Sequence, residues 1–174
     1  MDNMGNGLVP GIETYLADQS ALLERCHQRL LGYSSMWWGA SGTALTGDQI
    51  AAHADAADRY LAAPNAWLPH ATTEERAALY MAEHGVDVWD VPFLLDRRDL
   101  RTALIATQPS EDTRYVLQRI LSNLIAASTG APYALHDVWD LAPGRTLAEV
   151  RAMLCAAAAY ARRYGPVDAA RPAA

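Results

Sequence analysis

Apolar residues along this chain recur mainly at intervals of three and four positions, the spacing that places side chains on one face of an α-helix. The widest such face lies between Ser110 and Gly130 and consists of six aliphatic residues: Val116, Leu117, Ile120, Leu121, Leu124 and Ile125. Ser110 is a favourable N-cap, and Gly130 is typical of the end of a helix. We therefore predict a core helix between these two residues.

Five further segments have helical spacing, with predicted ranges 12–31, 47–62, 73–84, 97–107 and 146–165. The side chains predicted to cap helices are Thr46, Thr72 with Glu75, Asp96, and Thr146 with Glu149. The side chains predicted to face inward are Leu16, Leu23, His27 and Leu30; Ile50, Ala54, Ala57 and Leu61; and Leu100, Leu104 and Ile105. Only residues 136–140 are a brief candidate for extended structure. The predicted fold class is all-α.

The tetrapeptide Asp-Val-Trp-Asp occurs twice, at residues 87–90 and 137–140. Each copy follows a helix that ends at a glycine and precedes a capped helix. A weaker version, with Trp38 in the loop, separates the first two helices. Short repeats of this kind bury a shared core by stacking together. The repeat predicts three helix–loop–helix hairpins in a six-helix up-and-down bundle, a single domain with frayed ends at 1–10 and 167–174.

In such a bundle, the three long loops of the hairpins lie at the same end. Aromatic, acidic and basic side chains of these loops would then surround one mouth, as in many ligand pockets. The predicted ligand contacts are Trp37, Trp38, Trp89, Trp139, Tyr33, Tyr133 and Arg145. The predicted acid–base groups are Asp87, Asp90, His136, Asp137 and Asp140.

Each of these residues also has a purely structural interpretation. The indoles would then close the end of the bundle, with each N–H bonded to a partner. The aspartates would cap turns, since Asp side chains readily accept backbone N–H bonds. His136 would be an ordinary loop histidine.

The charge balance excludes several classes of function. The net charge is -6, all 14 basic residues are arginine, and no basic stripe suited to nucleic acid is visible. The absence of lysine excludes a Schiff-base lysine and a P-loop. The longest apolar run, residues 152–161, is too short to span a bilayer, and no signal peptide is recognised. We expect a cytoplasmic protein without membrane contact, and the alanine-rich, lysine-free composition suggests a GC-rich bacterial genome.

Neither a metal nor a cofactor is predicted. Glu24 and His27 have the E-x-x-H spacing of di-iron bundles, but those need two such motifs. The carboxylates around His136 have oxygen atoms suited to Mg²⁺ or Ca²⁺, yet no calcium-loop pattern accompanies them.

Two hypotheses of function follow from the sequence. The first is a small enzyme, of a kind suited to bacterial specialised metabolism, that binds an apolar or aromatic molecule and performs a cyclisation, elimination or isomerisation by acid–base chemistry. The second is a non-catalytic module that docks a protein partner, or sequesters a ligand, through its Trp-rich end. Homodimerisation through that end is a third. Burial of the carboxylates distinguishes the first two, because catalysis needs a concave site with perturbed titrating groups.

Overall fold

The computed structural model of the chain describes residues 12–33, 35–93 and 95–168, and for residues 12–17 it describes the backbone alone. These residues form seven α-helices, one 3₁₀ helix and no β-strand, which confirms the all-α prediction. The helices are α1 (Ile12–Leu30), α2 (Gly47–Leu61), α3 (Thr73–His84), η1 (Val88–Asp90), α4 (Leu100–Ala106), α5 (Glu111–Thr129), α6 (His136–Asp140) and α7 (Leu147–Tyr164).

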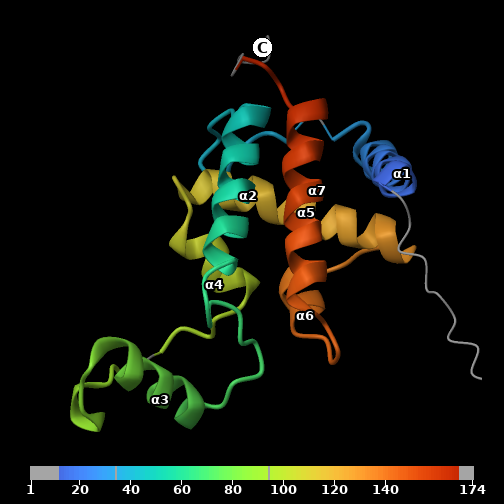
Figure 1. The fold of residues 1–174 in the computed structure, drawn as a ribbon. Helices are drawn as coiled ribbons and strands as arrows, with labels where there is room; N and C mark the ends of the chain where they lie inside the picture. The colour runs from blue at the N-terminus through green and yellow to red at the C-terminus, as the bar shows by residue number, and fades with distance from the viewer. Residues whose placement is uncertain (1–11, 34, 94, 169–174) are drawn as a thin grey trace, which may run out of the picture.

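The centre of the fold is the pair of helices α2 and α7, which lie side by side in Figure 1 and make the most extensive contact of any two elements. The predicted stripe of α2, Ile50, Ala54, Ala57 and Leu61, is completely buried. Gly47, at the start of α2, donates its N–H to the carbonyl of Pro166 at 2.9 Å. A Cβ on Gly47 would lie 2.2 Å from the carbonyl oxygen of Ala161, so this close approach requires glycine.

Helix α5 crosses behind this pair, and α1 packs on α5 and α7 (Figure 1). All six aliphatic residues predicted as the inward face of α5 are buried, which confirms the core helix. Leu23 and Leu30 of α1 are buried, whereas His27 is half-buried. The side chain of Leu16 lies outside the described residues.

The predicted caps at Thr46, Thr72 and Thr146 are all present, and all three are full capping boxes. The predicted start of the fourth helix is wrong. Asp99, not Asp96, caps α4, accepting from the N–H of Thr102 at 2.7 Å. Ile105 is exposed rather than inward-facing. Residues 136–140 form helix α6 and not an extended segment.

The regular stacking of three hairpins is not what the structure contains. Helix α3 leaves the body together with η1 and projects to one side (Figure 1). None of its side chains is buried among the residues that the structure describes. We call residues 72–93 the arm. The predicted frayed ends lie outside the described residues, except for residues 167 and 168.

Within the described ranges, no helix combines the length and apolar character needed to cross a bilayer.

Candidate functional site

The two Asp-Val-Trp-Asp copies have opposite environments. The first forms η1 on the arm, where Trp89 is 92% exposed and both aspartates are exposed. The second forms α6 against α4 and α5, where Trp139 is half-buried and Asp140 is 1% exposed. The repeat in the sequence is therefore not a repeat of the site.

The predicted common mouth is wrong, because the loops do not emerge at one end. Trp37 stacks on Tyr160 near the C-terminus of α7, with ring centroids 6.2 Å apart. Trp139 contacts Arg145, just before the N-terminus of α7. From Leu147 to Tyr160 the helix rises about 20 Å, so these two indoles lie at opposite ends of α7. Trp38 is half-buried in the loop between α1 and α2, and Trp89 lies on the arm.

Asp140 joins three separate parts of the chain. One carboxylate oxygen accepts the indole N–H of Trp67 at 2.9 Å, and the other accepts the backbone N–H of Leu100 at 2.7 Å. Burial raises the pKa of Asp140, and these two hydrogen bonds oppose that effect. No local pattern in the sequence indicated that Trp67, in a proline-flanked connection, is the partner of Asp140.

His136 lies one helical turn before Asp140 on α6 and is half-buried. Its Nδ1 lies 3.4 Å from the hydroxyl of Ser122, and its buried Nε2 has no partner among the described residues. Burial lowers the pKa of His136, while the nearby charge of Asp137 opposes that effect. Asp137 itself is exposed and accepts the N–H of Val138 at 3.0 Å.

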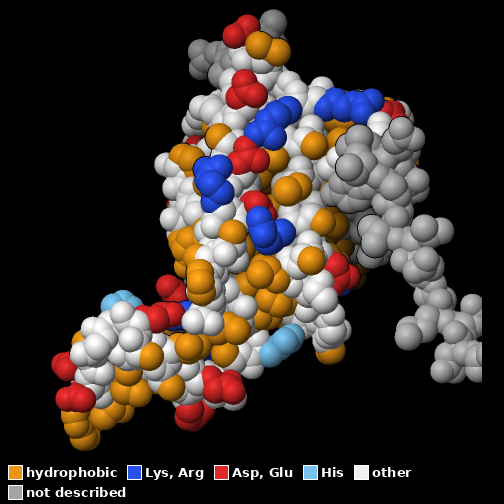
Figure 2. All heavy atoms as spheres, in the orientation of Figure 1, with side chains coloured by type: hydrophobic (Ala, Val, Ile, Leu, Met, Phe, Trp, Pro, Cys, Tyr) orange, Lys and Arg blue, Asp and Glu red, His pale blue; other side chains and the backbone are white. Residues whose placement is uncertain are grey.

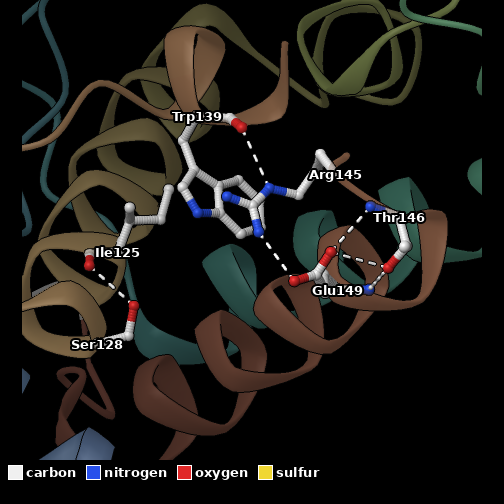
Figure 3. Close-up of polar contacts among 6 residues, drawn as sticks. All are labelled: Ile125, Ser128, Trp139, Arg145, Thr146 and Glu149. Atoms are coloured by element: carbon white, nitrogen blue, oxygen red, sulfur yellow. Dashed lines mark hydrogen bonds and ion pairs between the residues drawn. The ribbon is translucent and has the colours of Figure 1, made fainter. Parts of the chain in front are cut away.

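Arg145 is held in place on three sides (Figure 3). Its guanidinium lies 3.9 Å from the ring centroid of Trp139, and its Nε donates to the Trp139 carbonyl at 3.2 Å. Its Nη1 pairs with Glu149 at 3.0 Å. Glu149 also closes the capping box of α7 with Thr146. Arg145 thus joins α6 to α7, and it also borders a cleft of about 650 Å³ at the base of the arm.

Tyr33 and Tyr133, both predicted as ligand contacts, do lie together. They border a cleft of about 510 Å³ whose other lining residues are Arg29, Leu30, Arg119, Asn123 and Pro132. We call this the arginine cleft. Neither Arg29 nor Arg119 was predicted from the sequence. No motif marks them, because their proximity arises only from the packing of α1 against α5.

An apolar groove of about 290 Å³ continues from the arginine cleft on the other side of Tyr133. It is lined by Ile125, Thr129, Tyr133, Ala134, Leu135, Val138 and Trp139. Trp139 therefore borders a groove, and its role as a ligand contact stays a prediction. The clefts described here are not lined by any of the five predicted acid–base groups.

Among the described residues, no three His, Cys, Asp or Glu side chains are grouped closely enough to hold a metal ion. Comparisons with protein-family models, with curated proteins and with solved structures find no match.

Proposed function

We propose that this chain is a non-catalytic docking protein that binds a protein partner through the tip of the arm. The observation that carries the proposal is the exposure of two large aromatic side chains there, 92% for Trp89 and 99% for Phe93. A few buried aromatic anchors, tryptophan above all, supply most of the binding energy of protein interfaces. Val88, exposed beside Trp89, extends the same apolar surface.

The construction of the arm supports this proposal. An isolated helix as short as α3, with 12 residues, is only marginally stable in water. No side chain of α3 is fully buried, and Leu79, Tyr80 and Met81 are only half-buried, so the core contributes less to its order than to that of the central helices. A partner that covers the apolar side of the arm would supply the missing burial. Figure 2 shows the arm projecting from the body, with hydrophobic side chains on its outer edge.

Charge indicates the chemistry of the partner. Residues 72–93 contain five carboxylates and one arginine, so the arm carries a net -4 of the chain's -6. Asp87 and Asp90 flank the exposed indole. An apolar pocket with a basic rim complements such a tip, and complementary charges raise both the specificity and the rate of association.

The alternative of an acid–base enzyme stays a prediction. Asp140 has both carboxylate oxygens bonded within the fold, and Asp87 and Asp90 are solvated on the arm. Asp140 therefore suits a structural role that links three segments, and Asp87 and Asp90 suit the charged edge of a docking surface. None of these positions suits proton transfer in a concave site. For this reason we favour docking over catalysis.

Site-specific photo-crosslinking tests the proposal. A photoreactive residue replaces Val88, and in a matched control it replaces Val167, which is 90% exposed elsewhere on the surface. Proteins crosslinked only from position 88 are identified, purified and titrated against the wild-type chain. We expect Trp89→Ala and Phe93→Ala each to weaken binding, which raises the dissociation constant at least about tenfold.

Two results would contradict the proposal. One is the same set of crosslinked proteins from positions 88 and 167. The other is a purified partner that binds Trp89→Ala and Phe93→Ala as tightly as the wild type. Turnover of a small molecule that is lost in Asp90→Asn, while Trp89→Ala and Phe93→Ala have no effect on any binding, would favour the enzyme instead.

A further inference from the structure

The arginine cleft carries positive charge, and none of the described residues that line it is a carboxylate. The Nη2 of Arg29 donates to the carbonyl of Pro132 at 2.6 Å, and the Nη1 of Arg119 donates to the carbonyl of Ser35 at 3.1 Å. Neither guanidinium has a carboxylate within ion-pair distance in the part of the chain that the structure describes. These backbone contacts hold the two arginines in place. The Nε of Arg29 is buried, but both guanidinium groups keep further Nη–H groups that no described residue accepts and that could bind an anion.

Aromatic and aliphatic surface lies directly beside these charges. Tyr33 is 61% exposed and Tyr133 is 78% exposed, and both border the cleft. Tyr133 also borders the adjoining apolar groove, where Leu135 and Val138 are exposed. The surface therefore suits a ligand that is both acidic and aromatic.

The tip of the arm has the complementary composition. Asp87 and Asp90 supply two carboxylates, and Trp89 and Phe93 supply two aromatic rings within seven residues. Arg29 and Arg119 match the carboxylates, and Tyr33 and Tyr133 offer rings for aromatic contact. The arm does not occupy this cleft in its own chain, since no residue of the arm lines it.

We infer that the arm of one copy binds in the arginine cleft and adjoining groove of a second copy. This inference rests on the proposed function and names its partner as the chain itself. The contact joins two different surfaces, so each copy carries one donor surface, the arm, and one acceptor surface, the cleft.

Sedimentation of the full chain over a wide concentration range tests the inference. The arm variant combines Trp89→Ser with Phe93→Ser. The cleft variant combines Arg29→Gln with Arg119→Gln, and a second cleft variant, Tyr133→Ser, changes an exposed side chain with no hydrogen bond to lose in the described structure. The matched control combines Arg59→Gln with Val167→Ser, both exposed elsewhere.

We expect the wild type and the control to associate with increasing concentration, and the arm and cleft variants each to stay monomeric at the concentrations where the wild type begins to associate. A mixture of arm variant and cleft variant should form a one-to-one complex, because each supplies the surface that the other lacks. Each variant should weaken self-association at least about tenfold. Added salt should weaken it as well, since the contact pairs carboxylates with guanidinium groups.

A monomeric wild type, or cleft variants that associate like the wild type, would overturn the inference. The proposed function would survive either result if crosslinking from position 88 identifies another protein whose affinity depends on Trp89. The proposed docking function would fail together with the inference only if the arm variant changed neither self-association nor binding to that protein.

Discussion

Asp90 and Asp140 end two identical tetrapeptides, yet one lies in solvent and the other accepts two hydrogen bonds inside the fold. Their local sequences are the same, so the difference arises from the segments that pack around them. Trp67 and the N-terminus of α4 come to Asp140 from far away in the chain. The repeat could reveal equivalent positions in the sequence, but not which copy would be buried.

This pair provides a matched test of the role of Asp140. In Asp140→Asn, the new amide NH₂ replaces an acceptor and faces a buried N–H donor, so a hydrogen bond is lost and a donor is left unsatisfied. We expect a loss of about 1–3 kcal/mol in the free energy of unfolding, measured by urea denaturation. Asp90→Asn should change it by less than about 0.5 kcal/mol. Equal effects of the two substitutions would contradict a structural role for the two hydrogen bonds of Asp140.

His53 predicts how stability depends on pH. It is fully buried, with Nε2 2.9 Å from the carbonyl of Leu104, and burial lowers its pKa. In the unfolded chain the imidazole of His53 is protonated at about pH 6.5, whereas in the folded chain it is protonated only at lower pH. The free energy of unfolding therefore falls as the pH drops below about 6.5. His136 acts in the same direction, whereas Asp140, whose pKa is raised, acts in the opposite one.

The measurement is the free energy of unfolding at several pH values between about 5 and about 8. His53→Gln should flatten the decrease on acidification, whatever its effect on absolute stability. His84→Gln changes an exposed histidine on the arm and should leave the slope unaltered. An unchanged slope in His53→Gln would show that another group titrates in this range.

At the scale of elements, the sequence predicted most helices well because their signals are local. Caps, glycine stops and the apolar stripe of α5 all depend on residues within a few turns of each other. The packing of the helices does not. Helix α5 crosses α2 and α7 instead of running alongside them, and Trp37 and Trp139 contact opposite ends of α7. Chain order cannot determine such a crossing angle.

Helix α3 shows the limit of local signals most clearly. Its capping box and its C-terminal Gly85 predicted a helix correctly, but neither reports whether the helix packs. One bidentate ion pair fastens its end to the body, with Glu83 and Arg98 oxygen–nitrogen distances of 2.9 and 2.6 Å. Arg98 also donates to the carbonyl of Asn65 at 3.0 Å. Among the described residues, this is the one ion pair that links the arm to the body.

We expect Glu83→Gln to increase hydrogen exchange in α3, because the neutral amide cannot form the bidentate pair. Exchange in α5 and α7 should not change, since their protection arises from the core. Glu74→Gln provides the control, because Glu74 is exposed and has no ion pair in the described structure. Equal protection of α3 in Glu83→Gln and the wild type would mean that other contacts hold the arm.

At the scale of the whole molecule, apolar side chains serve two separate purposes. The body buries them between α2, α5 and α7, whereas the arm and the surface around Tyr133 leave them exposed. Charge is divided as well, with most of the net negative charge on the arm and two unpaired arginines of the described residues in the cleft. The numbers of apolar and charged residues follow from the composition alone. Their separation between the body, the arm and the arginine cleft depends on the fold.

This division predicts that the most exposed aromatic residues contribute nothing to stability. The double substitution Trp89→Ser with Phe93→Ser removes two large rings, yet both are solvated in the folded and the unfolded chain. We expect its free energy of unfolding, measured on the monomer at low concentration, to stay within about 0.5 kcal/mol of the wild type. Leu121→Ala, which removes a smaller but fully buried side chain, should cost about 2–5 kcal/mol. A large loss in the double variant would mean that the rings pack within the chain, and the arm would then have no exposed anchors with which to bind a partner.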